Sequence, residues 1–129
     1  MKKDIHIPKV EDVFVAVVQE QHPEYKTDDW NAYIINNKDV DLDTVLIVSK
    51  GYSEEKVTPL MRHTIKHLPA RSYAKIEFMQ NDVLKLNNEF KITFFEGNQM
   101  LDKIYLFRKN TINVKAVQTI PLMQLKGVL

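Results

Sequence analysis

The sequence contains a run of six apolar residues, Val13-Phe14-Val15-Ala16-Val17-Val18, in which four are valine. Further short segments along the chain alternate apolar with polar side chains. Branching at Cβ suits a pleated strand better than a helix, and a period of two places alternate side chains on one face of a sheet. The pattern therefore predicts a chain of β-strands that pack face to face.

The alternating and the apolar segments indicate where the strands lie along the chain. We expect strands over 5–7, 13–19, 30–36, 42–49, 60–68, 72–79, 90–94 and 104–107. The strand over 13–19 is apolar on both faces, which indicates a central position in its sheet. The segment 60–68 also has a helix start signal in Thr58 and Pro59, but its alternation favours a strand. Gly97-Asn98 indicates a hairpin between the last two of these strands.

Alternation also assigns side chains to faces. In the strand over 72–79, we expect Ala74, Ile76 and Phe78 on one face and Tyr73, Lys75 and Glu77 on the other. Trp30 follows the central strand, where a buried core tryptophan is expected. The segment 112–129 is apolar but irregular, because Pro121 blocks a continuous ladder of hydrogen bonds.

About seven to nine short strands with antiparallel turn signals predict an all-β protein, an immunoglobulin-like antiparallel β-sandwich. A small β-barrel is the main alternative. One core is normal at a length of 129 residues, so we expect a single domain over 1–129.

Composition limits the partners and the compartment. The net charge is only +1 and cysteine is absent, which removes disulfides and thiol chemistry and fits a cytoplasmic protein. The six-residue apolar run is far shorter than the roughly 20 residues that span a bilayer, so we expect no membrane association. The amino terminus lacks the apolar stretch of a signal peptide.

Two segments can be tested as metal sites, and neither predicts one. The segment 39–43 begins like a calcium loop, but Thr44 stands where an EF-hand requires glycine and Lys50 where it requires glutamate. His63 and His67 are four residues apart, yet two nitrogen ligands are too few for a tetrahedral zinc site. We therefore expect no metal and no cofactor.

Catalytic motifs are not found either. None of Ser49, Ser53 and Ser72 lies in a nucleophile elbow, and the sequence has no glycine-rich phosphate loop. The expectation is therefore a protein without enzyme activity.

A basic stretch is the main candidate for nucleic-acid binding, because no acidic residue occurs between Glu55 and Glu77. Charges of this kind bind phosphate when they share one face of a strand. A nearly neutral chain gives weak long-range attraction, so RNA binding is the weaker expectation. The candidate anion or RNA surface consists of Arg62, His63, Lys66, His67, Arg71 and Lys75.

The remaining candidate is a protein interface. If one face of the strand over 13–19 fills the core, the other face must also be covered. The cover is either the apolar tail of the chain or the same strand of a second subunit. The residues of this possible homodimer interface are Val13, Val15, Val17, Leu122 and Leu125.

Several short motifs resemble a known family. They are Trp30-Asn31-Ala32-Tyr33, Lys50-Gly51-Tyr52, Met61-Arg62-His63 and Ser72-Tyr73-Ala74-Lys75-Ile76-Glu77, in this order across most of the chain. Together they look like a family of short uncharacterised bacterial proteins, some of which are named as related to the alpha subunit of phenylalanyl-tRNA synthetase. That name implies a synthetase core with ATP-binding arginines, but Arg62, Arg71 and Arg108 stand in no such motif. The resemblance implies at most a tRNA-related partner.

The sequence thus predicts a non-enzymatic binding or protein-interaction module, which we expect to dimerise through an apolar sheet face or through its tail. The alternative is a tRNA-binding or RNA-binding accessory protein that uses the basic stretch over 56–75.

Overall fold

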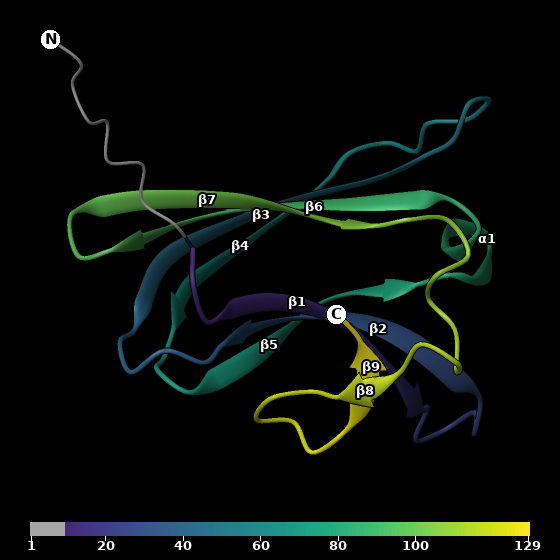
Figure 1. The fold of residues 1–129 in the computed structure, drawn as a ribbon, viewed down its shortest axis with the longest axis horizontal. Helices are drawn as coiled ribbons and strands as arrows, with labels where there is room; N and C mark the ends of the chain where they lie inside the picture. The colour runs from purple at the N-terminus through teal and green to yellow at the C-terminus, as the bar shows by residue number, and fades with distance from the viewer. Residues whose placement is uncertain (1–9) are drawn as a thin grey trace, which may run out of the picture.

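A computed structural model of the chain describes residues 10–129. Within these residues, the chain forms two antiparallel sheets that stack face to face (Figure 1). Each sheet ends in two edge strands, so neither closes into a barrel. The predicted β-sandwich is confirmed, and the barrel alternative is wrong.

One sheet has five strands in the order β5-β2-β1-β9-β8, with β1 at its centre as predicted. The strands are β1 (Val13–Gln21), β2 (Asp28–Asn36), β5 (Ser72–Met79), β8 (Gln118–Thr119) and β9 (Lys126–Val128). The other sheet has four strands in the order β4-β3-β6-β7. They are β3 (Leu42–Tyr52), β4 (Met61–Leu68), β6 (Asn87–Glu96) and β7 (Gln99–Phe107).

The core fills the space between the sheets and follows the predicted alternation. Its fully buried side chains include Val15 and Ile34 from the five-stranded sheet and Ile47, Phe90 and Phe94 from the four-stranded sheet. Trp30 is also buried in this core, as expected. Alternate residues on the same strands point outward, and these outward residues form the surfaces on which any function depends.

The strand predictions are largely confirmed. The ambiguous segment 60–68 is the strand β4, and β5 has the predicted bounds. The hairpin between β6 and β7 turns at Gly97, whose φ of 61° lies in the left-handed region that favours glycine. The short helix α1 (Asn81–Leu84) was not predicted. The strand expected over 5–7 lies outside the described residues.

Two face assignments on β5 are wrong, those of Glu77 and Phe78. The pairing of β2 with β5 shifts between Ala32 and Tyr33, which leaves Ile76 without a partner and reverses the alternation beyond it. Glu77 therefore points toward the other sheet, while Phe78 lies on the outer face and is 49% exposed. A bulge re-aims side chains in this way because it adds one residue to one strand only.

The tail of the chain covers part of the outer face of the five-stranded sheet. β9 pairs with β1 within the sheet, and the turn between β8 and β9, yellow in Figure 1, folds over its outer face. Ile120 and Met123 are buried there against Ala16, Val18 and Ile35. The sequence left open whether this face is covered by the tail of the same chain or by a second subunit. In the structure, the tail of the same chain covers part of it.

The predicted interface requires a correction. Val13, Val15 and Val17 are at most 1% exposed and lie in the core between the sheets, so they cannot contact a second subunit. The error arose because the sequence did not show which face of the strand turned toward the second sheet. Leu122 and Leu125 are each 38% exposed on the tail, and their part in an interface stays a prediction.

Candidate functional site

The six basic residues predicted as one surface are distributed over several parts of the molecule. Arg62 and Lys66 alternate onto the outer face of β4, whereas Lys75 lies on the outer face of the other sheet. The guanidinium of Arg71 donates hydrogen bonds to Asp39 at 2.7 Å and to Asn37 at 2.9 Å. The basic stretch therefore does not form one cationic surface.

The two histidines contact different carboxylates. In His67, Nδ1 lies 2.9 Å from Asp43 and Nε2 lies 3.2 Å from Asp41. The hydrogen bond to Asp43 is the main cause of a pKa of His67 raised above its usual value of 6.5. In residues 10–129, no group of three or more histidine, aspartate or glutamate side chains is placed to hold a metal ion.

His63 belongs to a polar cluster at the open side of the sandwich, between the edge strands β4 and β5. Its Nε2 lies 3.1 Å from Oε1 of Glu77, and the hydroxyl of Ser49 donates a hydrogen bond of 2.6 Å to the same oxygen. Both contacts depend on the bulge that turns Glu77 inward. Serine, histidine and glutamate meet here, but the serine is bonded to the carboxylate and not to the imidazole that would act as its base.

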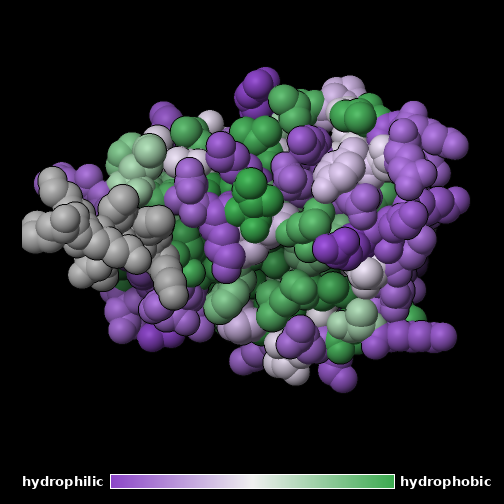
Figure 2. Space-filling view, turned by 45° about the horizontal axis from the view of Figure 1, so that its top comes forward, coloured by the Kyte–Doolittle hydropathy of each residue, from purple (hydrophilic) through white to green (hydrophobic). Residues whose placement is uncertain are grey.

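The outer face of the four-stranded sheet is the larger candidate surface. Register places Val48 between Arg62 and Lys91, and places Lys91 beside Ile104. The next row toward the β6–β7 turn contains Leu46 between Thr64 and Thr93. Figure 2 looks obliquely onto this side of the molecule and shows hydrophobic side chains scattered among hydrophilic ones.

This face has an excess of positive charge. Its cations are Lys50, Arg62, Lys66 and Lys91, and its carboxylates are Glu89, Asp102 and Asp43, the last of which contacts His67. Lys50 and Glu89 pair at 3.7 Å. Among the described residues, Arg62, Lys66 and Lys91 make no ion pair within 4 Å. The face therefore carries aliphatic side chains and cations side by side.

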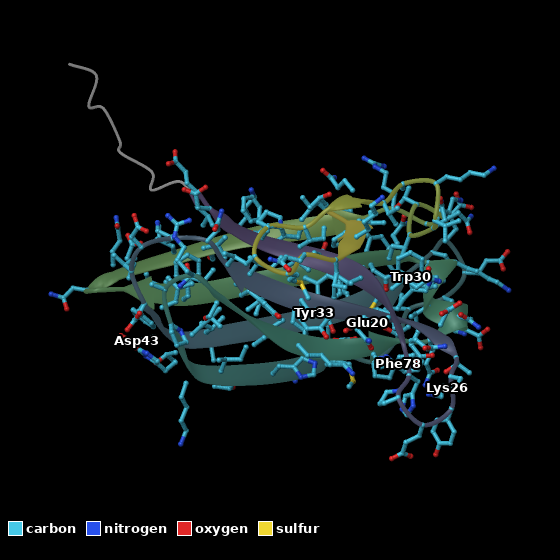
Figure 3. The ribbon with its side chains drawn as sticks, turned by 90° about the horizontal axis from the view of Figure 1, so that it is seen from below. Glu20, Lys26, Trp30, Tyr33, Asp43 and Phe78 are labelled. Carbon is cyan, nitrogen blue, oxygen red and sulfur yellow. The ribbon has the colours of Figure 1, made fainter. Side chains whose placement is uncertain are left out.

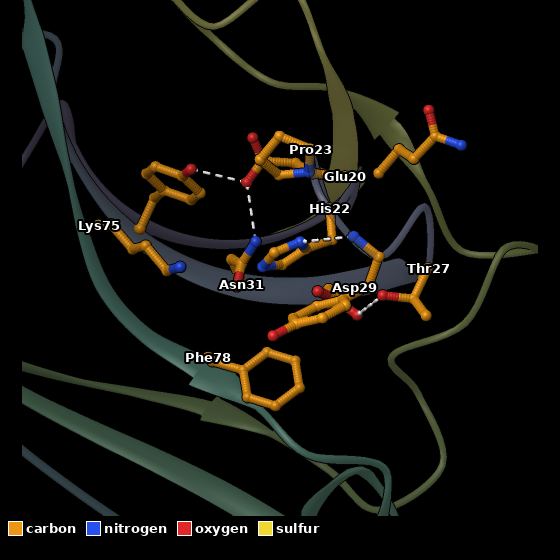
Figure 4. Close-up of a pocket in the computed structure, with 11 residues that line it drawn as sticks. Glu20, His22, Pro23, Thr27, Asp29, Asn31, Lys75 and Phe78 are labelled. Carbon is orange, nitrogen blue, oxygen red and sulfur yellow. Dashed lines mark hydrogen bonds between the residues drawn. The ribbon is translucent and has the colours of Figure 1, made fainter.

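A hollow of about 690 Å³ is the second candidate site. It lies on the outer face of the five-stranded sheet, where the β1–β2 hairpin turns (Figures 3 and 4). Figure 3 shows Glu20, Tyr33 and Phe78 together on this face, toward the turn that contains Lys26. Volumes of a few hundred Å³ are typical of sites for small molecules.

Glu20 organises one wall of the hollow. Its Oε1 accepts a hydrogen bond of 2.6 Å from the hydroxyl of Tyr33 and one of 3.0 Å from Nδ2 of Asn31. Burial, together with the hydrogen bond to Glu20, raises the pKa of Tyr33 well above its usual value of 10.0. Tyr33 therefore stays protonated and continues to donate to the carboxylate at physiological pH.

Sequence reasoning did not find this hollow. Glu20 and Tyr33 are 13 residues apart in the chain and meet only through the register of the β1–β2 hairpin. One usable signal existed, because Asn31 and Tyr33 place two polar groups on one face of a strand whose other face is apolar.

Comparisons with known proteins assign no family or fold relative. No family model, no curated protein and no solved structure matches the chain. Among the described residues, no helix is both long and apolar enough to cross a membrane.

Proposed function

We propose that this chain is a non-enzymatic interaction module that binds an acidic, amphipathic segment of a partner protein. The binding surface is the outer face of the four-stranded sheet. One observation carries the proposal: the tail of the chain covers part of the equivalent face of the five-stranded sheet, whereas this face exposes aliphatic side chains among cations.

The chemistry of the face suggests the character of the partner. Leu46 on β3 and Ile104 and Leu106 on β7 are between 42% and 54% exposed. The polar residues of β6 lie between them, so the aliphatic and the charged side chains alternate across the face. Arg62 and Lys91 flank Val48 in the same row. A segment with acidic and apolar side chains would bury the aliphatic groups and pair with the cations, which gives both affinity and orientation.

The polar cluster at the open side supports a function without catalysis. The hydroxyl of Ser49 is committed to Glu77, so Ser49 and His63 do not form a nucleophile and base pair. Ser49 is also only 4% exposed, which limits access of a substrate to its oxygen.

A labelled peptide tests the proposal. The probe is a fluorescein-labelled peptide in which glutamate and leucine alternate, and the matched control peptide has lysine in place of glutamate. Fluorescence anisotropy should show binding of the acidic peptide only. The double variant Arg62→Glu with Lys91→Glu should weaken that binding at least about tenfold.

The control variant is Lys26→Glu, which makes the same change of charge in the β1–β2 turn of the other sheet. It should bind the acidic peptide as the unmodified protein does. Equal binding of the two peptides, or equal loss of binding in Lys26→Glu, contradicts a specific site on the four-stranded sheet.

RNA binding is the second candidate function, because Arg62 and Lys66 share the outer face of β4. Tyr73, an aromatic residue of the basic stretch that could stack on bases, does not belong to that face. Its ring packs on Tyr33 of the other sheet, with ring centroids 5.9 Å apart. Titration with bulk tRNA at two salt concentrations tests this alternative. Salt-sensitive binding that Arg62→Glu removes would favour RNA over a protein partner, and would give weight to the synthetase-related resemblance.

A homodimer through the tail is a smaller proposal, supported by the exposure of Leu122 and Leu125. Light scattering of the double variant Leu122→Ser with Leu125→Ser should then show a monomer where the unmodified protein is a dimer. A cytoplasmic location is proposed from the absence of cysteine alone.

A further inference from the structure

The hollow on the five-stranded sheet has a charge arrangement that the fold does not require. Glu20 and Asp29 are directly opposite each other on β1 and β2, so two carboxylates occupy one cross-strand pair. Like charges in such a pair reduce stability. Both residues line the hollow, where a bound cation would remove the repulsion between them.

A buried acceptor lies beside this pair. Asn31 is 7% exposed and lines the hollow. Its Nδ2 donates to Glu20, which fixes the orientation of the amide and leaves Oδ1 as a buried oxygen with no hydrogen-bond donor among residues 10–129. A buried polar atom without a partner costs about 1–3 kcal/mol, so a ligand or water that donates to it gains that energy back.

Aromatic rings form part of the remaining lining. Nδ1 of His22 accepts hydrogen bonds from the backbone N–H groups of Glu24 and Tyr25, at 3.1 and 3.2 Å. The rings of His22 and Tyr25 stack with centroids 4.7 Å apart. Tyr25 and Phe78 line the hollow together with the two carboxylates, and Figure 4 shows Phe78 in the lining. Aromatic faces attract organic cations.

We propose that this hollow binds an organic monoamine. The ammonium group lies between Glu20 and Asp29, because its N–H donors match the acceptors there. The carbon chain lies against the rings of Tyr25 and Phe78. This site is separate from the docking face of the four-stranded sheet, so it is independent of the function proposed above.

Lys75 should make the hollow prefer a ligand with one positive charge over a ligand with two. Its ammonium group also lines the hollow, and it makes no ion pair within 4 Å with any of the residues 10–129. A second cation at the far end of a ligand would meet this charge and be repelled. A monoamine should therefore bind more tightly than a diamine with the same carbon chain.

Three ligands of equal chain length test the proposal: pentylamine, pentan-1-ol and 1,5-diaminopentane. Binding is measured by calorimetry and by amide chemical shifts of the β1–β2 hairpin. Pentylamine should bind at least about tenfold more tightly than either of the other two, a difference of about 1.4 kcal/mol. The variant Lys75→Met should bring the diamine close to the monoamine.

Two variants and one control locate the ammonium group. Glu20→Gln and Asp29→Asn should each weaken binding of pentylamine at least about tenfold, since each removes one negative charge. Asp29→Asn leaves the hydrogen bonds of Glu20 to Tyr33 and Asn31 intact, so its effect cannot be attributed to loss of that network. Glu24→Gln makes the same chemical change in the same hairpin, outside the lining, and should have no effect.

Three results overturn the proposal. The first is pentanol binding as tightly as pentylamine, which would make the site apolar rather than cation-specific. The second is no binding of pentylamine at concentrations of about 10 mM, and the third is unchanged binding in both carboxylate variants.

Discussion

The hydroxyl of Tyr105 on β7 donates a hydrogen bond of 2.5 Å to the carbonyl oxygen of Val13 at the start of β1. This contact joins the edge of the four-stranded sheet to the central strand of the other sheet, across 92 residues of sequence. The phenylalanine variant Tyr105→Phe should lower the free energy of unfolding by about 1 kcal/mol, because a partly buried hydrogen bond is lost while the ring remains. Urea denaturation measures the change.

Tyr25→Phe is the matched control for this substitution. Tyr25 is 74% exposed and its ring lies in the β1–β2 turn, so removal of its hydroxyl should leave the free energy of unfolding unchanged. Equal effects of the two substitutions would show that the hydrogen bond to Val13 adds nothing to stability.

Stability should also fall at alkaline pH. Burial raises the pKa of Tyr105 and of Tyr33 above the usual value of 10.0. Above about pH 10, the unfolded chain releases these protons while the folded protein keeps them, so the free energy of unfolding decreases as the pH rises. The stabilisation is complete below that pH. Denaturation curves at several alkaline pH values should show a smaller decrease in Tyr105→Phe than in the unmodified protein.

The pKa of His67 should lie above the usual value of a histidine. Its imidazole is exposed but lies between Asp41 and Asp43, and the hydrogen bond to Asp43 is the main cause of its raised pKa. Asp43→Asn should lower that pKa toward 6.5, as followed by the ring proton shifts in NMR. The same substitution at Asp102, on the far edge of the sheet, should leave the titration of His67 unchanged.

The contact between His67 and Asp43 should change the free energy of unfolding with pH in one direction. A raised pKa in the folded state means that the contact stabilises the protein at acidic pH and that the gain is lost as the pH rises through the pKa of His67. The gain should be small because the pair is exposed.

Gly127 is a position where the tail depends on the absence of a side chain. It pairs with Val18 in the ladder of β1 and β9, and a Cβ placed there would lie 2.6 Å from the carbonyl oxygen of Val17. Gly127→Ala should therefore destabilise the protein by about 1–3 kcal/mol and increase hydrogen exchange in β9. Gly97→Asn is a suitable comparison, because no atom lies within 4 Å of a Cβ there and asparagine tolerates the positive φ.

Local pattern was sufficient to predict most of the strands. β1 and β3 contain valine-rich runs, and the period of two in β4 outweighed the helix start signal at Thr58 and Pro59. α1 could not be predicted because four residues are too few to show a helical period. The direction of Glu77 was predicted wrongly because a bulge depends on the pairing of two strands, which one strand's sequence does not contain.

Prediction of the candidate sites depends even more on knowing which strands pair and in which register. Glu20 and Asp29 become neighbours only when the hairpin register is known, and the turn between them gives no unique register. The six basic residues, by contrast, are close in sequence but lie on different faces of the molecule. Two of them, His67 and Arg71, contact different carboxylates. The chain passes from one sheet to the other between Arg62 on β4 and Lys75 on β5, so closeness in sequence does not place these two residues on a shared face.

The last prediction concerns the cover of the five-stranded sheet. Ile120 is 1% exposed and packs with Met123 on Ala16 and Val18, so Ile120→Ala should lower the free energy of unfolding by about 2–4 kcal/mol. Leu122→Ala, two residues away and 38% exposed, should cost much less because its side chain leaves no comparable cavity. Thermal and urea denaturation of both variants compare them directly.

The same two variants separate an internal cover from an interface. If the tail mainly stabilises its own chain, Ile120→Ala lowers the melting temperature without changing the molecular mass in solution, and the shift does not depend on protein concentration. A melting temperature that rises with protein concentration in the unmodified protein but not in Leu122→Ala would instead place the tail at a contact between two copies. The burial of Ile120 within one chain favours the first result, since an interface residue would lose its cover when the copies separate.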